Sequence, residues 1–246
     1  MNDFDENESL SSERQYGFGK GKSRLGAVAD GDAGGISVTR YNLILGGVLL
    51  WGFLANALIC FFTRGIDLLD YAPHILIGYL VLALIGVLLT RSHSAVVSFI
   101  GYNLVVIPLG FVLSLYISGF EPLLVTTVFL ETAAVTLTMM MLSLVFPNLF
   151  LSLGRALGIT LLIVIVVELI ASLVMIATGA FNDGFFLVID GIVVVVFSLY
   201  IGYDWAIAQR RQRSVDAAVD SACALYLDII NLFIRLLSIA GRRSRK

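Results

Sequence analysis

The sequence predicts an all-α membrane protein with seven transmembrane helices. Of its 246 residues, 59% are hydrophobic and only 14% are charged, whereas a soluble domain carries roughly 25% charged residues. Seven apolar stretches each approach the ~20 residues that a helix needs to cross a bilayer. Helices are the expected spanning form because these stretches are too long and too few to be the strands of an ordinary barrel.

Residues 1–40 differ from the rest of the chain because they are rich in Asp, Glu, Ser and Gly and contain no long apolar run. We predict a disordered polar tail here, which serves either as a docking segment for another protein or as a solvated terminus. The membrane domain is expected over residues 41–240, followed by a basic tail over residues 241–246. The expected spans are Tyr41–Thr63, Pro73–Thr90, Ala95–Ile117, Pro122–Phe146, Ile159–Thr178, Phe185–Tyr203 and Ala217–Ile239.

Positive charge in the short connections predicts the orientation of the chain, because Lys and Arg accumulate in cytoplasmic loops. With seven full spans, the side of the N-terminus carries Arg40, Arg91, Arg155, Arg210, Arg211 and Arg213. The opposite connections carry Arg64 together with Asp67, Asp70, Glu121 and Asp183. We therefore expect a cytoplasmic N-terminus. The terminal GRRSRK disagrees, since seven full spans place it outside, whereas a seventh segment that dips in and returns would place it inside.

Acidic residues inside the apolar stretches are the first candidates for function. An ionisable side chain in the bilayer costs several kcal/mol unless it is paired, hydrated or neutralised. Asp204 and Asp228 lie on consecutive stretches and could meet. Two neighbouring carboxylates cannot both ionise cheaply in a low dielectric, so such a pair would share a proton and titrate as a unit. This predicts a pH-dependent switch, although each acid could instead be a neutral, hydrogen-bonded helix contact.

A polar stripe accompanies Asp228. Asp228, Asn231 and Arg235 are spaced by three and four residues, so they share one face of a helix. Such a face is expected to point into the bundle or toward water and not toward lipid, so Asn231 and Arg235 are possible members of an ion path. Tyr200 lies four residues before Asp204 and shares its face.

The sequence allows more than one interpretation for four further charged residues. Glu168 and Asp190 could be steps on a cation path, or partners for Arg235 or for each other. Arg91 ends the second stretch and could pair with Asp204 to hold a pore shut, or it could be an interfacial topology signal. Glu131 could also lie on the cation path, but it precedes the small-residue run TAAVTLT, which suits close helix packing, so packing is the simpler interpretation.

Several function classes find no support in the sequence. The formal net charge of −2 argues against nucleic-acid binding. There is no Gly-rich phosphate loop, no HExxH, no GxSxG and no EF-hand pattern, so neither an enzyme nor a resident cofactor is expected.

Two stretches near the C-terminus carry a resemblance to a known family. These are VFSLYIGYD, which ends at Asp204, and ALYLDIINLFIRLL, which contains Asp228. They resemble the Bax-inhibitor-1 family, the transmembrane Bax inhibitor motif proteins, and in particular its bacterial YetJ-like and YccA-like branch. The similarity is strong over Val195–Leu237, weaker from Arg91 to Leu142, and absent from the N-terminal tail.

The resemblance implies a seven-helix fold with the C-terminal helix at the centre, and a pH-sensitive calcium leak gated by paired aspartates. The sensor positions of the family match Asp204 and Asp228, which would also offer Ca²⁺ a transient site. The latching arginine matches Arg91, and a glutamate of the fourth helix matches Glu131. The chain departs from the pattern by having no acid between Pro73 and Thr90. Glu168, Asp190 and Arg235 are additions to the pattern.

Two functions from different classes follow. The leading expectation is a leak that passes Ca²⁺ or another cation across a bacterial cytoplasmic membrane, with protonation of the aspartate pair shifting the balance between open and closed states. Proton-coupled exchange would use the same acids but would also move protons. The alternative is a non-conducting regulator that binds another membrane protein, such as a membrane-anchored protease, through the N-terminal tail.

Overall fold

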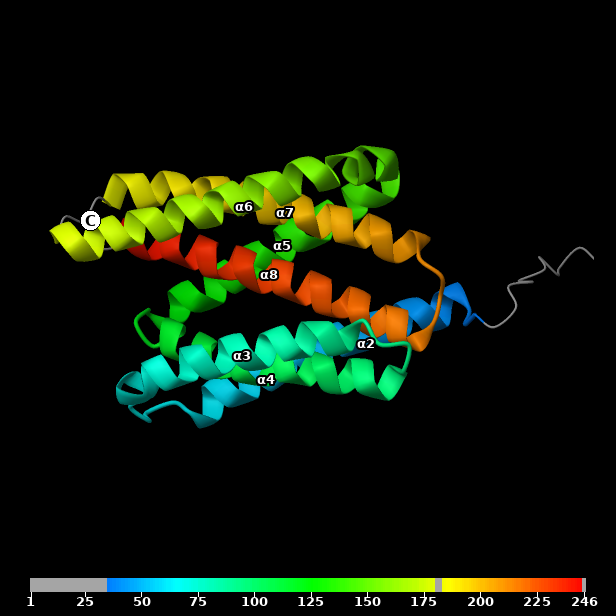
Figure 1. Cartoon of the computed structure of the whole chain (residues 1–246), viewed down its shortest axis with the longest axis horizontal. Coiled ribbons are helices and arrows are strands. Elements are labelled where there is room, and N and C mark those ends of the chain that lie inside the picture. Colours follow the sequence, from blue (N-terminus) through cyan, green and yellow to red (C-terminus); the bar gives the residue numbers. More distant parts are fainter. Residues whose placement is uncertain (1–34, 180–182, 245–246) are drawn as a thin grey trace, which may run out of the picture. The chain divides into compact units, whose positions relative to one another are not determined.

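The computed structural model describes residues 35–179 and 183–244. Within these ranges the chain forms seven helices that are long and apolar enough to cross a membrane (Figure 1). They are α2 (Val38–Phe62), α3 (Ala72–Thr90), α4 (Ala95–Ile117), α5 (Pro122–Val145), α6 (Pro147–Thr178), α7 (Asp183–Arg210) and α8 (Val215–Ser244), with a short 3₁₀ helix, η1 (Leu69–Tyr71), before α3. The predicted all-α fold with seven spans is confirmed.

Several helices are longer than the apolar stretches that predict them. α6 begins at Pro147 and not at Ile159, and α7 continues past Tyr203 to Arg210, because polar residues can extend a helix beyond the hydrocarbon. Asp204 therefore lies within α7 and not after its end. α2 begins at Val38, where the Ser37 hydroxyl accepts a hydrogen bond from the backbone N–H of Arg40 at 3.3 Å. The rest of the predicted disordered tail, residues 1–34, lies outside the described residues.

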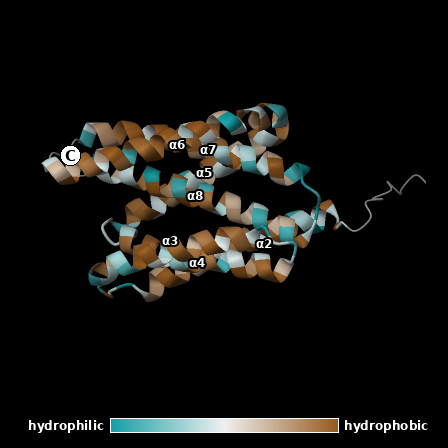
Figure 2. Ribbon diagram, in the orientation of Figure 1, coloured by the Kyte–Doolittle hydropathy of each residue, from teal (hydrophilic) through white to brown (hydrophobic). Residues whose placement is uncertain are grey.

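α8 is the central helix of the bundle. It packs against α2, α3, α4, α5 and α7, and it has the largest buried share of the seven spans. Figure 1 shows α8 between a group formed by α2, α3 and α4 and a group formed by α5, α6 and α7. Hydrophobic residues cover most of the surrounding helices, and hydrophilic residues gather at helix ends and along α8 (Figure 2). The expected central position of the C-terminal helix is confirmed.

Local sequence sets where several helices start and stop. Pro122 and Pro147 stand at the first positions of α5 and α6, where the missing N–H costs nothing and the fixed φ suits a helix. Gly179 ends α6 with φ 68°, a left-handed conformation that favours glycine. Ser214 directly precedes α8, and its hydroxyl accepts a hydrogen bond from the N–H of Ala217 at 3.2 Å.

Contacts between connections define the two ends of the bundle. The N–H of Ile36 donates to the carbonyl of Arg213 at 2.9 Å, which places the start of α2 beside the α7–α8 connection. We call this end the arginine end. The opposite end, the η1 end, holds the α2–α3 and α4–α5 connections and the end of α8, where Gly241 approaches Phe120. α8 runs through 30 residues without a break, about 45 Å, so it joins the two ends and does not dip in and return.

Candidate functional site

The site begins with two aspartates on neighbouring helices. The carboxyl groups of Asp204 on α7 and Asp228 on α8 lie close enough for a side-chain hydrogen bond between them. A hydrogen bond between two carboxyl groups requires a proton on one of them, because an ionised carboxylate only accepts. Asp228 is 7% exposed, and no other described residue donates to its buried Oδ2. The structure thus brings together the two acids that the sequence analysis singled out, in an arrangement that suits a shared proton.

Charged and aromatic groups surround this pair. The hydroxyl of Tyr200 on α7 lies within electrostatic range of both Asp204 and Asp228. Its proximity to Asp204 agrees with the helix face that the two residues share. Toward the arginine end, Asp204 faces Asp220 and Arg211. Asp204 therefore has a negative and a positive neighbour at the start of α8.

Asp220 and Arg211 form an ion pair of their own. The guanidinium of Arg211 donates to Oδ2 of Asp220 at 2.5 Å. The hydroxyl of Thr90 donates to Oδ1 of the same carboxylate at 3.2 Å, which ties the end of α3 to α8. Both side chains of the ion pair are partly exposed, at 40% for Arg211 and 22% for Asp220, so the pair contributes little to stability and can exchange partners.

A second charged cluster lies farther along α8 and joins three helices. Arg235 of α8 donates to both carboxylate oxygens of Glu168 on α6, at 2.6 and 2.8 Å. Its Nη1 also donates to Oδ1 of Asp190 on α7 at 2.8 Å. Oδ2 of Asp190 accepts from Arg242 at 2.7 Å and from Ser238 at 2.7 Å. We call these five residues the α6–α8 charge cluster.

The charges of this cluster balance. Glu168 and Asp190 supply two carboxylates, and Arg235 and Arg242 supply two guanidinium groups. Asp190 is 2% exposed, so it needs this pairing to stay charged inside the bundle. Of the readings that the sequence left open for Glu168 and Asp190, the structure shows both acids as partners of Arg235.

The cluster also accounts for Arg242, one of the basic C-terminal residues that disagreed with the charge rule. Arg242 is bonded to Asp190 and Ser238 and lies 5.9 Å from the ring centroid of Phe186. It is therefore part of the charge balance inside the bundle and not a free positive charge at the membrane surface. Its position at the η1 end is compatible with seven full spans.

Together the two sites form a continuous polar face on α8. Its members are Asp220, Asp228, Asn231, Arg235, Ser238 and Arg242, all within about 80° around the helix at 100° per residue. From first to last they extend about 33 Å along the axis, close to the ~30 Å of a bilayer core. The amide of Asn231 donates to the carbonyl of Leu227 at 2.7 Å. We call this the α8 polar face. From Asp228 onward its partners lie on α7 and α6, whereas Asp220 contacts Thr90 of α3 and Arg211 of the α7–α8 connection.

Two predicted site residues lie outside this arrangement. Arg91 follows the last turn of α3, is exposed, and makes no ion pair with any residue in the described ranges. Glu131 is exposed on α5 and has no partner in the described part of the chain. Their roles as latch and path residue stay predictions.

Sequence reasoning missed the roles of Asp220, Ser238 and Arg242. The signal for Ser238 and Arg242 was the continuation of the three- and four-residue spacing that begins at Asp228, and Asp220 lies about two helix turns before Asp228 on the same face. Among the described residues, no group of three or more His, Cys, Asp or Glu side chains could hold a metal ion. The transient Ca²⁺ site at Asp204 and Asp228 stays a prediction.

Comparison with known proteins adds the family. The model of the family described as "Inhibitor of apoptosis-promoting Bax1" matches residues 38–245, which include every span and the whole α8 polar face. The chain belongs to the Bax inhibitor-1 family. The resemblance drawn from the α7 and α8 stretches is confirmed.

The relatives of this Bax inhibitor-1 family chain are bacterial. An uncharacterised membrane protein of Streptococcus pyogenes serotype M1 is 31% identical over 215 residues, covering 82% of this chain and 90% of the relative. Its counterpart in serotype M6 is 30% identical over the same length. An uncharacterised protein of Helicobacter pylori is 38% identical over 85 residues, and the match spans about a third of its length (35%). These likenesses and the seven apolar helices make this family member a membrane protein.

Proposed function

We propose that this chain is a pH-sensitive cation leak of the membrane, with Ca²⁺ as a transported ion. The observation that carries the proposal is the contact between Asp204 and Asp228 within the α8 polar face. Two carboxyl groups that share a proton inside a membrane bundle respond to pH within their titration range. The polar face is about as long as the bilayer core is thick, and its carboxylate, amide and hydroxyl oxygens are groups that a hydrated cation can use along its way.

The proton on the aspartate pair sets the state of the proposed gate. With one proton, Asp204 and Asp228 bind each other and neither needs a positive partner. When pH rises and that proton leaves, the two carboxylates repel, and Asp204 gains from a guanidinium nearby. An arginine drawn to Asp204 would close the arginine end of the path. The leak is therefore expected to rise as pH falls and to decline as pH rises.

Two arginines can serve as this latch. Arg91 is the one that the family resemblance indicates, and it has no ion-pair partner among the described residues. Arg211 already faces Asp204 but is bonded to Asp220. In the proposed mechanism the pair shown here is protonated, and Arg91 is free to move toward Asp204 when the proton leaves.

Calcium is a suitable ion for this path. Ca²⁺ takes six to eight oxygen ligands from carboxylates, carbonyls and water in a flexible geometry. The aspartate pair offers carboxylate oxygens, and water can complete the shell. We place the protein in a bacterial cell membrane, because the matched relatives are bacterial. The arginine end lies on the cytoplasmic side, because arginines dominate that end.

The decisive experiment measures Ca²⁺ flux into proteoliposomes from about pH 5 to about pH 8, because a shared proton makes the proposed gate depend on pH. The wild-type chain should show a flux that rises several-fold toward low pH. Asp228→Asn should flatten that profile, because asparagine neither binds nor releases the proton. Asp70→Asn, which neutralises an exposed aspartate outside the proposed path, is the matched control and should keep the wild-type profile. If folded wild-type protein moves no Ca²⁺ at any pH, the leak is excluded and the partner-binding alternative gains.

The latch makes a separate prediction. Arg91→Gln should raise Ca²⁺ flux at about pH 8, the end of the range at which the proposed latch closes the path, and should change the flux at low pH little. Arg155→Gln removes an exposed arginine of the same end and should leave both values unchanged. A flux equal to wild type in Arg91→Gln, with a raised flux in Arg211→Gln, would assign the latch to Arg211.

A further inference from the structure

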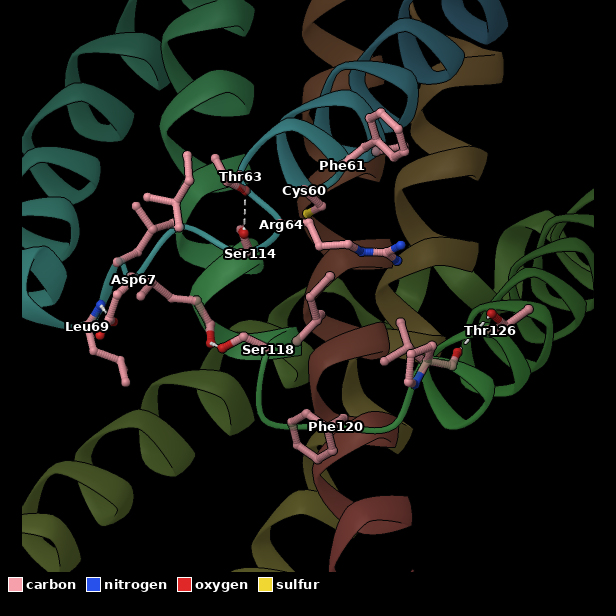
Figure 3. A pocket seen from close by; sticks show the side chains of 18 residues that line it. Cys60, Phe61, Thr63, Arg64, Asp67, Leu69, Ser114, Ser118, Phe120 and Thr126 are labelled. Carbon is pink, nitrogen blue, oxygen red and sulfur yellow. Dashed lines mark hydrogen bonds between the residues drawn. The ribbon is translucent and has the colours of Figure 1, made fainter.

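Two adjoining hollows lie at the η1 end, away from the aspartate pair. The first is a polar vestibule of about 710 Å³ between the α2–α3 connection and the α4–α5 connection. Its lining includes Thr63, Arg64, Asp67, Ser114 and Ser118. The hydroxyls of Thr63 and Ser114 are hydrogen-bonded to each other at 2.6 Å (Figure 3). The vestibule thus combines hydroxyl groups with one positive and one negative side chain.

The second hollow is an apolar groove of about 550 Å³ between α2 and α5. α2 and α5 both pack on α8 but are not a closely packed pair, so α8 forms the floor between them. That floor consists of Ile229, Ile230 and Phe233. The lining of α5 runs from Val125 to Leu137, about 18 Å along its axis. This length is comparable to the ~15 Å half-thickness of a bilayer core, which one acyl chain fills.

The vestibule and the groove are continuous. Both are lined by Ala57, Cys60, Ile117, Val125 and Thr126. The polar part lies beyond the end of α2, and the apolar part lies along the helix toward the middle of the bundle. A molecule that fills both must have a polar group at the level of the membrane surface and a long apolar portion below it.

Arg64 gives the polar part its charge preference. Its exposed guanidinium makes no ion pair or hydrogen bond with any residue of the described ranges. In Figure 3 it extends across the vestibule toward the side of Thr126 on α5, while Asp67 lies on the opposite side. The Asp67 carboxylate is engaged locally, because it accepts from the backbone N–H of Leu69 at 3.0 Å. The group next to the groove is therefore a free positive charge.

We propose that the vestibule and the groove form one binding site for a phospholipid with an anionic headgroup. The phosphate binds Arg64 as a charge-assisted hydrogen-bonded pair, and one acyl chain lies in the groove against α8. This acyl chain would contact Ile229, the residue next to Asp228 in the sequence. This proposal does not depend on ion conduction, since it rests on shape, polarity and charge at the η1 end.

The test is native mass spectrometry of the full chain in detergent with equal amounts of phosphatidylglycerol and phosphatidylethanolamine. Wild-type protein should retain phosphatidylglycerol in preference to phosphatidylethanolamine. Arg64→Gln should lower bound phosphatidylglycerol several-fold, and Arg155→Gln, at the opposite end, should leave it unchanged. Equal retention of the two lipids by wild-type protein, or retention by Arg64→Gln at the wild-type level, overturns the proposal.

The groove has its own matched pair of variants. Ala133→Phe fills the groove and should lower retention of both lipids, whereas Ala134→Phe, on the exposed neighbour that lines neither hollow, should not. Ala57→Phe is a second groove variant should Ala133→Phe fail to fold. Excess glycerol phosphate should not displace the lipid. If it does, the site binds the headgroup alone and the lipid assignment is overturned. Equal lipid retention by Ala133→Phe and Ala134→Phe would also overturn it.

Discussion

Asp190→Asn is expected to lower the free energy of unfolding by about 3 kcal/mol. Asp190 accepts hydrogen bonds from Arg235, Ser238 and Arg242 and is almost completely buried. Loss of its charge leaves two guanidinium groups inside the bundle with only Glu168 to balance them. Removing one partner of a buried ion pair costs about 3–5 kcal/mol, and the partial exposure of both arginines favours the lower figure.

Thermal unfolding in detergent micelles measures this effect. Glu168→Gln should destabilise the protein less than Asp190→Asn, because Asp190 has three donors and joins α7 to α8 at two levels. Glu131→Gln, on an exposed acid, should stay within about 0.5 kcal/mol of wild type. If Asp190→Asn is as stable as Glu131→Gln, the α6–α8 charge cluster does not hold the bundle together.

Gly86→Leu is expected to separate α3 from α4. A Cβ atom on Gly86 would lie 2.6 Å from the backbone carbonyl oxygen of Gly101 on α4, and a backbone atom cannot rotate away. Overpacking typically costs about 1–3 kcal/mol and occasionally more, and the backbone contact places this variant at the upper end. Small residues at such helix crossings let membrane helices approach closely.

Gly78 provides the matched control on the same helix. A Cβ atom there meets no other residue within 4 Å, so Gly78→Leu should keep the wild-type melting temperature. The readout is thermal unfolding together with a disulfide crosslink between single cysteines engineered on facing positions of α3 and α4. Gly86→Leu should lose the crosslink and Gly78→Leu should keep it. Equal crosslinking in both variants would mean that the α3–α4 contact tolerates a larger side chain.

The number of spans and the meeting of the two aspartates could be predicted from the sequence. Long apolar runs have few alternatives in a membrane, and two acids on consecutive helices have a strong reason to meet. The central position of α8 was predicted from the family resemblance. It agrees with the polar face of this helix, because a polar face is more stable inside the bundle than against lipid. That face, from Asp220 to Arg242, continues the three- and four-residue spacing visible around Asp228.

Partner choice within the bundle could not be predicted. Spacing places Arg235 on a face of α8, but it does not say which acids reach that face from α6 and α7. Glu168 and Asp190 were therefore left with several readings until the helix packing fixed their distances. The vestibule was also invisible in the sequence, because Arg64 and Ser114 lie 50 residues apart and meet only at the ends of their helices.

The position of α8 has a consequence for the making of this protein. Chains emerge from the ribosome from the N-terminus, so six helices enter the membrane before the helix that they surround. Until α8 arrives, Glu168 and Asp190 lack the arginines that neutralise them, and the two helix groups lack the surface that joins them. The bundle can therefore assemble fully only after α8 has been inserted. A chain that ends before Val215 would keep Glu168 and Asp190 without their arginine partners.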